Sequence, residues 1–174
     1  MAGILFCICN SSFAQITGSF RIEEPEVEVF ESGYEPYVSI SFPGSQPMTE
    51  IGCPQLPYVT RSYVVPIGAR VTGVRVTRLS KPLFPGYYRI VPAQPPVPVN
   101  YVEMSPDFQI NDSLYASSGG YPGERVRILS DGYDQGYHIV TVGIYPVEYR
   151  PVSQELYLCD IDYILEYSVA AARN

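Results

Sequence analysis

The segment that decides the fold is IGCPQLPYVTRSYVVPIGARVTGVRV, residues 51–76. Its apolar side chains recur every second residue in YVTRSYVV (Tyr58–Val65) and in RVTGVRV (Arg70–Val76), which is the period of a β-strand. Pro54 and Pro57 have a ring-fixed φ angle and no amide proton, so they favour a stiff turn ahead of the first strand. The segment therefore predicts a turn, a strand, a second turn and a second strand, and it contains no catalytic motif.

The same alternation continues outward from this segment in seven other stretches. They are Glu26–Phe30, Tyr37–Phe42, Gly86–Val91, Arg125–Ser130, Tyr137–Tyr149, Gln154–Cys159 and Asp160–Val169. The chain has 16 tyrosines, 17 prolines and 14 glycines, a composition that suits strands joined by turns. We expect an all-β fold, an antiparallel, jelly-roll-like β-sandwich of about nine or more strands.

Two kinds of connection are expected between these strands. Residues 130–137 (SDGYDQGY) form a short hairpin connection, in which Asp131-Gly132 and Gln135-Gly136 can adopt positive φ angles. The other connection is long and spans residues 92–123, beginning with the proline-rich PAQPPVPV. A connection of this length in a compact domain is usually functional or disordered. No window has a convincing helical period, although residues 106–118 could hold one helical turn.

The 174 residues are enough for one domain, which we place at 26–170, preceded by an N-terminal arm at 15–25. Residues 1–14 are predicted to be a secretory signal peptide, cleaved between Ala14 and Gln15. The apolar run at residues 3–9 is too short to span a bilayer, and the positive residues typical of a signal start are missing. The alternative is a buried N-terminal strand.

Removal of residues 1–14 would leave two cysteines, Cys53 and Cys159. An exported chain with two cysteines can form one disulfide, and two buried free thiols are the alternative. Neither cysteine is expected at a helix N-terminus, where a thiolate would be stabilised.

Composition argues against several other functions. The net charge of −7 disfavours nucleic acid as a partner, and the ligand spacings of common metal and phosphate sites are missing. The single histidine, His138, is expected to be an ordinary strand residue, so we predict no catalytic dyad, no cofactor and no metal. The tyrosines could instead form a glycan-stacking platform, although core and rim positions explain them more simply.

Seven residues of the opening segment carry a resemblance to a known family: Gly52, Pro54, Leu56, Pro57, Val65, Pro66 and Gly68. They resemble the G-x-P-x-L-P turn, strand and V-P-x-G turn at the start of the propeptide domain of gingipain-type cysteine peptidases. The proline-rich residues 92–98 and the segment from Tyr121 to Val169 resemble later parts of the same domain. The resemblance spans residues 20–169.

This resemblance implies a non-enzymatic prodomain of an exported bacterial cysteine peptidase, with the catalytic domain downstream in the same precursor. In the family the prodomain packs on the catalytic domain, assists its folding and blocks its cleft until it is removed. The expected partner is that catalytic domain, and the prodomain is expected to be a secreted or surface-exposed monomer. The alternative is a non-enzymatic β-sandwich module that binds a glycan or a protein.

The resemblance also implies an inhibitory segment, and the best match is residues 103–123 of the long connection. The blocking residue of the gingipains is basic, whereas this segment has no Lys or Arg. The chain therefore departs from the family pattern here. The candidates for an apolar blocking residue are Met104, Phe108, Leu114 and Tyr115.

Overall fold

The computed structural model describes residues 11–30, 36–96 and 108–170. Twelve strands and one short helix lie in these ranges. In chain order they are β1 (Ser11–Phe20), β2 (Glu26–Phe30), β3 (Tyr37–Ser41), β4 (Gln46–Pro47), β5 (Pro57–Val65), β6 (Arg70–Ser80), β7 (Leu83–Phe84), α1 (Asp112–Tyr115), β8 (Val126–Asp134), β9 (Tyr137–Ile144), β10 (Val147–Arg150), β11 (Glu155–Leu158) and β12 (Asp160–Ala170).

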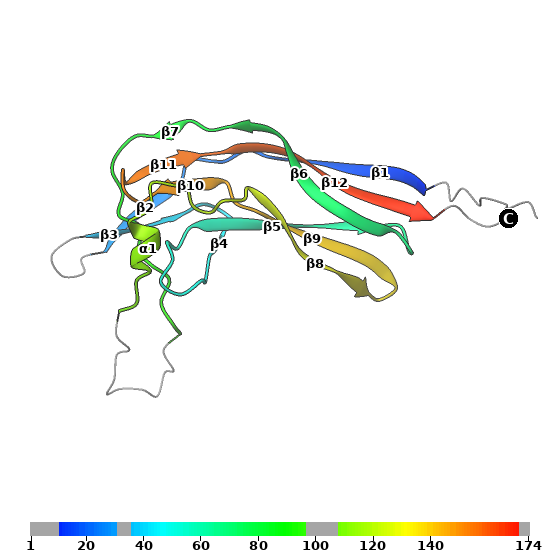
Figure 1. Ribbon diagram of the computed structural model, residues 1–174, viewed down its shortest axis with the longest axis horizontal. Helices are drawn as coiled ribbons and strands as arrows, with labels where there is room; N and C mark the ends of the chain where they lie inside the picture. Colours follow the sequence, from blue (N-terminus) through cyan, green and yellow to red (C-terminus); the bar gives the residue numbers. More distant parts are fainter. Residues whose placement is uncertain (1–10, 31–35, 97–107, 171–174) are drawn as a thin grey trace, which may run out of the picture.

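The strands form two packed layers, which Figure 1 shows one above the other. One layer contains the sheet β1-β12-β6, and the other contains the sheet β4-β5-β9-β8. The smaller sheets β10-β11-β7 and β2-β3 lie toward the end where α1 is found. All strand pairs in these sheets are antiparallel, so the predicted all-β antiparallel sandwich is confirmed.

The core is filled by the inward side chains of both sheets, as the period of two predicts. Val140, Val142 and Ile144 of β9 belong to the same core cluster as Ile161 and Leu165 of β12, and all five have no exposed area. A polar contact also crosses the core, because the hydroxyls of Tyr63 and Tyr163 lie 2.6 Å apart. Burial raises the pKa of Tyr163.

Three sequence predictions differ from the structure. The stretch expected as one strand from Tyr137 to Tyr149 is divided into β9 and β10 around Pro146, which has no amide proton for a ladder. Residues 86–91 form no strand, and Ile90 alone bridges to Val38. Asp131-Gly132 lies within β8, and the hairpin turn is made by Gln135 and Gly136, with φ angles of 47° and 85°.

Candidate functional site

The base of the long connection is built on the turn at Gly52 and Cys53. Gly52 N donates to Ala93 O at 2.8 Å, and Ala93 N donates to Cys53 O at 2.9 Å. Asn111 N then donates to Gly52 O at 2.9 Å. Gly52 has a φ of +79°, and a Cβ there would lie 3.1 Å from Asn111 N. The turn therefore forms hydrogen bonds with both stems of the connection, residues 92–96 and 108–111. A glycine is needed where the two stems meet, because Gly52 has a positive φ angle and little space for a side chain.

Gln94 joins the two stems directly. Its Nε2 donates to Gln109 O at 2.8 Å, and its Oε1 accepts from Gln109 N at 2.9 Å. Nε2 also donates to Pro92 O at 3.1 Å. One amide side chain thus satisfies both backbone groups of Gln109, which holds the stems that lead to residues 97–107 side by side.

The second stem is fixed by α1 and by its first residues. The side chain of Asn111 caps the helix by accepting from Leu114 N at 3.1 Å. The hydroxyl of Tyr115 donates to Ile90 O at 2.6 Å, and burial raises the pKa of Tyr115. The helix is therefore anchored to the sandwich by a hydrogen bond as well as by its backbone.

The connection leaves the sandwich over a group of charges centred on the buried side chains of Glu148 and Arg125. The carboxylate of Glu148 lies 2.9 Å from Lys81 Nζ, 3.5 Å from Arg150 Nε and 3.9 Å from Arg125 Nη2. The backbone at Gly120 runs so close that a Cβ there would lie 2.5 Å from Glu148 Oε1. Glycine at this position therefore lets the chain pass directly over the charge cluster.

A groove lies beside the end of the connection. It consists of two hollows of about 260 and 270 Å³ that share the side chains of Met48, Glu50, Arg127 and Tyr145. The guanidinium of Arg127 lies over the Tyr145 ring, 5.3 Å from its centroid, and its Nη2 donates to the Tyr145 hydroxyl at 2.6 Å. An arginine held in this way presents its remaining donors in a fixed orientation.

The four predicted blocking residues occupy different settings. Met104 lies outside the described residues. Phe108 is 48% exposed and contacts the ring of Tyr37 at a centroid distance of 5.4 Å. Leu114 and Tyr115 are half-buried in α1, and the Tyr115 hydroxyl anchors the helix to Ile90 O. Phe108 is therefore the described candidate with the largest area available to a partner.

Cys53 and Cys159 are both buried, and each is a free cysteine in the structure. The disulfide between them remains a prediction. Asn111 Nδ2 lies 3.9 Å from Cys53 Sγ, and Cys159 Sγ donates to Tyr157 O at 3.8 Å. Burial raises the pKa of both thiols, and Glu50 adds to the effect at Cys53. Neither environment activates a nucleophile.

Ala14 and Gln15, the predicted cleavage position, lie within β1 and pair with Tyr167 and Glu166 of β12. Residues 15–20 of the predicted N-terminal arm therefore belong to a sheet, and residues 21–25 form the connection to β2. Cleavage after Ala14 would retain residues 15–20 of this strand. The signal peptide remains a prediction.

His138 lies on β9, with its Nε2 2.6 Å from Asp131 Oδ1 and its ring 4.5 Å from that of Tyr133. It is buried at one end of the sandwich, among strand residues. Within residues 11–30, 36–96 and 108–170, no group of three or more potential ligands is placed to hold a metal ion. The same ranges contain no helix with the length and hydrophobicity of a membrane span.

Comparison with known proteins identifies the family. The Propeptide_C25 family model matches residues 7–165. The chain belongs to this propeptide family. It is 30% identical over 151 residues to Lys-gingipain HG66 and to Lys-gingipain W83 of Porphyromonas gingivalis, over 84% of the chain and 9% of each relative. The chain thus spans a small part of the length of these relatives.

Two solved structures have the same fold. One comes from work on the zymogenic latency of gingipain K of P. gingivalis, with a TM-score of 0.76, 26% identity and coverage of 95% of this chain and 97% of that chain. The other is a complex of the pro- and mature domains of RgpB of P. gingivalis, with a TM-score of 0.72, 17% identity and coverage of 96% and 84%. The predicted resemblance to gingipain prodomains is confirmed.

Sequence reasoning did not identify the residues that hold the connection. Gln94 stands in a proline-rich stretch, and Gln109 and Gly120 lie in segments with no periodic pattern. The one local signal was Gln94 itself, an isolated polar residue in the proline-rich PAQPP. Such a residue suggests that its side chain hydrogen-bonds to another segment. The pairing of Gly120 with Glu148 joins residues far apart in the chain and had no such signal.

Proposed function

We propose that this domain inhibits the catalytic domain of a gingipain-type cysteine peptidase in the same precursor and assists its folding. The observation that carries the proposal is the double attachment of the long connection. Gln94 joins its stems, while the turn at Gly52 and the hydroxyl contact of Tyr115 fix them to the sandwich. A segment fixed at both stems loses little conformational entropy when it enters a cleft.

Phe108 is the proposed pocket-filling residue of the described part of the connection. It has 48% of its area exposed, and residues 103–123 provide no basic side chain for a pocket that selects Lys or Arg. The catalytic domain should therefore accept a large apolar residue at its specificity pocket. We propose further that the precursor is exported, as the predicted signal peptide of residues 1–14 requires, and that the prodomain acts as a monomer.

The test is inhibition in trans. The purified chain is added to the mature catalytic domain encoded downstream, and residual peptidase activity is measured. We expect inhibition at micromolar prodomain, and a loss of about tenfold in potency for Phe108→Ala, the usual effect of removing a central anchor. The exposed aromatic Tyr87 supplies a matched control, because Tyr87→Ala should leave potency unchanged.

Folding assistance has a separate readout. The denatured catalytic domain is diluted from urea with and without the prodomain, and the yield of active enzyme is measured after the prodomain is removed. A higher yield with the prodomain is expected. Absence of inhibition together with an unchanged yield would contradict the proposal and favour the binding-module alternative.

A further inference from the structure

The outer face of the sheet β4-β5-β9-β8 has an uncharged centre, with charged side chains only at its two ends. Strand register places Thr60, Ser62 and Val64 of β5 beside Gly143, Thr141 and Ile139 of β9. The alternate residues of both strands, such as Val65 and Val140, are buried in the core. The outward side chains, which we call the plain face, are Tyr58, Thr60, Ser62 and Val64 of β5, Tyr137, Ile139 and Thr141 of β9, and Arg127, Leu129, Ser130, Gly132 and Asp134 of β8. The two charged members, Arg127 and Asp134, lie at opposite ends of this face.

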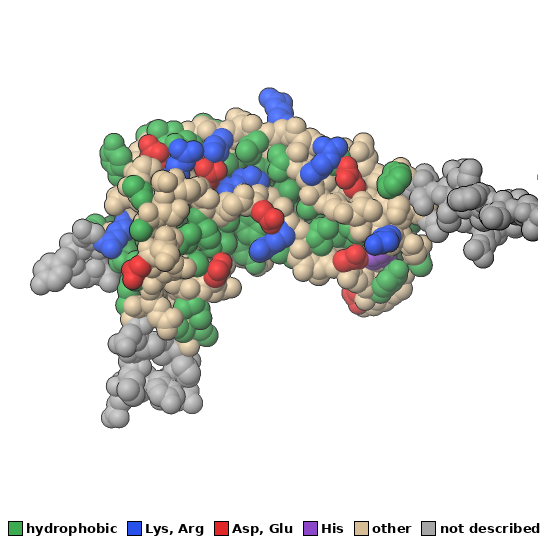
Figure 2. Space-filling view, viewed as in Figure 1, with side chains coloured by type: hydrophobic (Ala, Val, Ile, Leu, Met, Phe, Trp, Pro, Cys, Tyr) green, Lys and Arg blue, Asp and Glu red, His purple; other side chains and the backbone are tan. Residues whose placement is uncertain are grey.

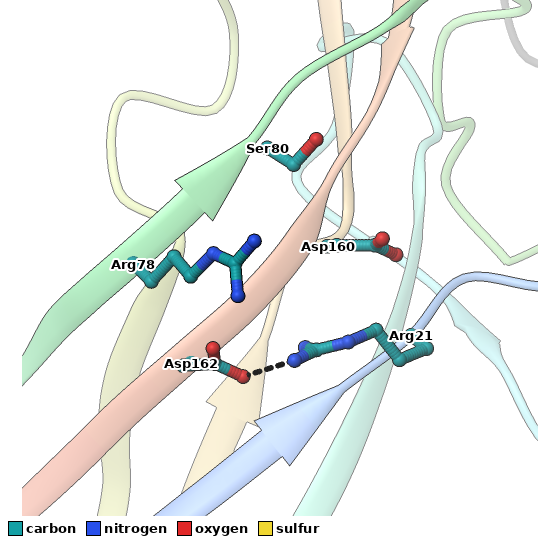
Figure 3. A pocket seen from close by; sticks show the side chains of 5 residues that line it. All are labelled: Arg21, Arg78, Ser80, Asp160 and Asp162. Carbon is teal, nitrogen blue, oxygen red and sulfur yellow. Dashed lines mark hydrogen bonds and ion pairs between the residues drawn. The ribbon is translucent and has the colours of Figure 1, made fainter.

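The other large sheet has the opposite character on its outside. Outward positions of β6 and β12 carry Arg75, Arg78, Asp162 and Glu166. A hollow of about 110 Å³ lies on this side and is lined by arginine and aspartate side chains. Figure 3 shows these side chains, with Arg21 paired to Asp162 at a distance of 2.6 Å. In Figure 2, Lys and Arg side chains gather over the upper part of the view, the layer of β6 and β12. We call this the charged face.

The plain face is exposed although much of it is apolar. Val64 is 62% exposed, Tyr137 is 61% exposed and Leu129 is 40% exposed. At its centre the hydroxyls of Ser62 and Thr141 lie 3.0 Å apart and satisfy each other. Soluble proteins usually place charged side chains on open sheet surfaces, and an exposed, partly apolar patch whose centre lacks them is typical of an interaction surface.

The plain face is continuous with the groove at the end of the connection. Tyr58, Leu129 and Arg127 belong to the plain face and also line that groove. Figure 1 shows the sheet running from the end that holds α1 to the β8–β9 hairpin. A partner that engages the connection can therefore extend along this sheet without crossing an intervening element of the described chain.

We propose that the plain face is the docking surface for the catalytic domain, and that it receives an uncharged, largely apolar patch of that domain. The inference rests on the proposed function and adds a second area of contact to the connection. Complementarity favours such a patch, because a buried charge opposite Val64 and Ile139 would lose its hydration without gaining a partner. In this complex the charged face, with its ion pairs, stays exposed to solvent.

The test introduces charges of both signs into the plain face. Val64→Glu and Ser62→Lys place a charge at exposed positions, and Thr17→Glu adds one at an exposed β1 position on the charged face as the matched control. The dissociation constant of each full chain for the mature catalytic domain is measured by calorimetry. Circular dichroism and thermal melting of the same samples show whether each variant is folded.

We expect each plain-face variant to bind about tenfold more weakly or worse, since a desolvated charge is costly, and the control to change less than about twofold. Unchanged binding by both folded variants overturns the docking surface while leaving inhibition by the connection intact. Failure of the wild-type chain to bind at all overturns the proposed function and this inference with it. A sedimentation experiment that shows a dimer dissociated by Val64→Glu, with binding unaffected, assigns the surface to a second copy and also overturns it.

Discussion

Carboxylate–cation pairs occur in two different settings in this domain. Beneath the end of the connection, Glu148 lies 2.9 Å from Lys81, and the side chains of Glu148 and Arg125 are only 11% and 7% exposed. On the charged face, Glu166 lies 3.0 Å from Arg75, and these two side chains are 39% and 59% exposed. The distances are almost the same, so burial is what distinguishes the two settings.

Because the two ion-pair settings differ in burial, they have different roles in the domain. The loss of the Glu148 carboxylate would be costly, because it would leave the charge of Arg125, whose side chain is 7% exposed, with little water to solvate it. The carboxylate therefore fixes the path of the chain at Gly120, directly above it. An exposed pair contributes little stability, since water and salt compete with it. It keeps an open sheet face soluble instead.

The largest expected effect comes from removing the buried carboxylate. Glu148→Ala leaves Arg125 buried without its counter-charge, and we expect a loss of about 3–5 kcal/mol in the free energy of unfolding. Urea unfolding followed by circular dichroism measures this loss. A loss below about 1 kcal/mol would show that the buried cluster behaves like the exposed pair.

A smaller effect is expected from crowding the same cluster. Gly120→Ala puts a methyl group into the space held by Glu148, and overpacking of this kind costs about 1–3 kcal/mol. Gly123→Ala is the control, because a Cβ at Gly123 meets nothing within 4 Å. Equal stability of the two variants, measured by urea unfolding, would contradict the close approach of the connection to Glu148.

The buried tyrosine beneath the charged face, Tyr163, should make the domain less stable at alkaline pH. Burial raises the pKa of Tyr163 above the value of the unfolded chain, about 10, so stability is retained below that pH and lost as pH rises beyond it. Each such group contributes a slope of up to about 1.4 kcal/mol per pH unit. Tyr163→Phe should show a shallower decline between pH 10 and 11 in urea unfolding. An unchanged slope would place Tyr163 in contact with solvent.

The smallest effect is expected on the charged face itself. Glu166→Ala should change the free energy of unfolding by less than about 1 kcal/mol, because both partners are exposed. The wild-type pair should also weaken when salt is raised, whereas the Glu148 cluster should respond little. Unfolding curves of wild type and variant at low and high salt provide the comparison, and a large salt-independent loss would be inconsistent with an exposed pair.

Much of the fold follows from local sequence. The stretch EVEVF is β2 with the predicted bounds, and the alternating face of Ile161, Tyr163 and Leu165 is buried as its period requires. The prediction of β-structure failed at residues 86–91, where neighbouring prolines and Gly86 disfavour a ladder. It also merged β9 with β10, because alternation continues across Pro146 while the hydrogen bonding changes sheets.

The candidate site was less predictable than the fold. The length and proline content of residues 92–123 located the connection, and the family resemblance suggested its role. The clamp of Gln94 on Gln109 and the passage of Gly120 over Glu148 depend on tertiary contacts between segments without periodicity. Polar contacts of this kind leave no repeating pattern in a single sequence, whereas a packed strand does.

The pairing of β1 with β12 determines when the domain can complete its folding during synthesis. Ser11 lies opposite Ala170, so the first strand of the described fold has its partner in the last strand of that fold, about 150 residues later in the chain. At usual elongation rates the intervening chain takes roughly ten to thirty seconds to appear. During that interval the sheet β1-β12-β6 lacks its central strand. Truncated or stalled chains therefore cannot complete the sandwich, and only a fully translated domain can present the charged and plain faces together.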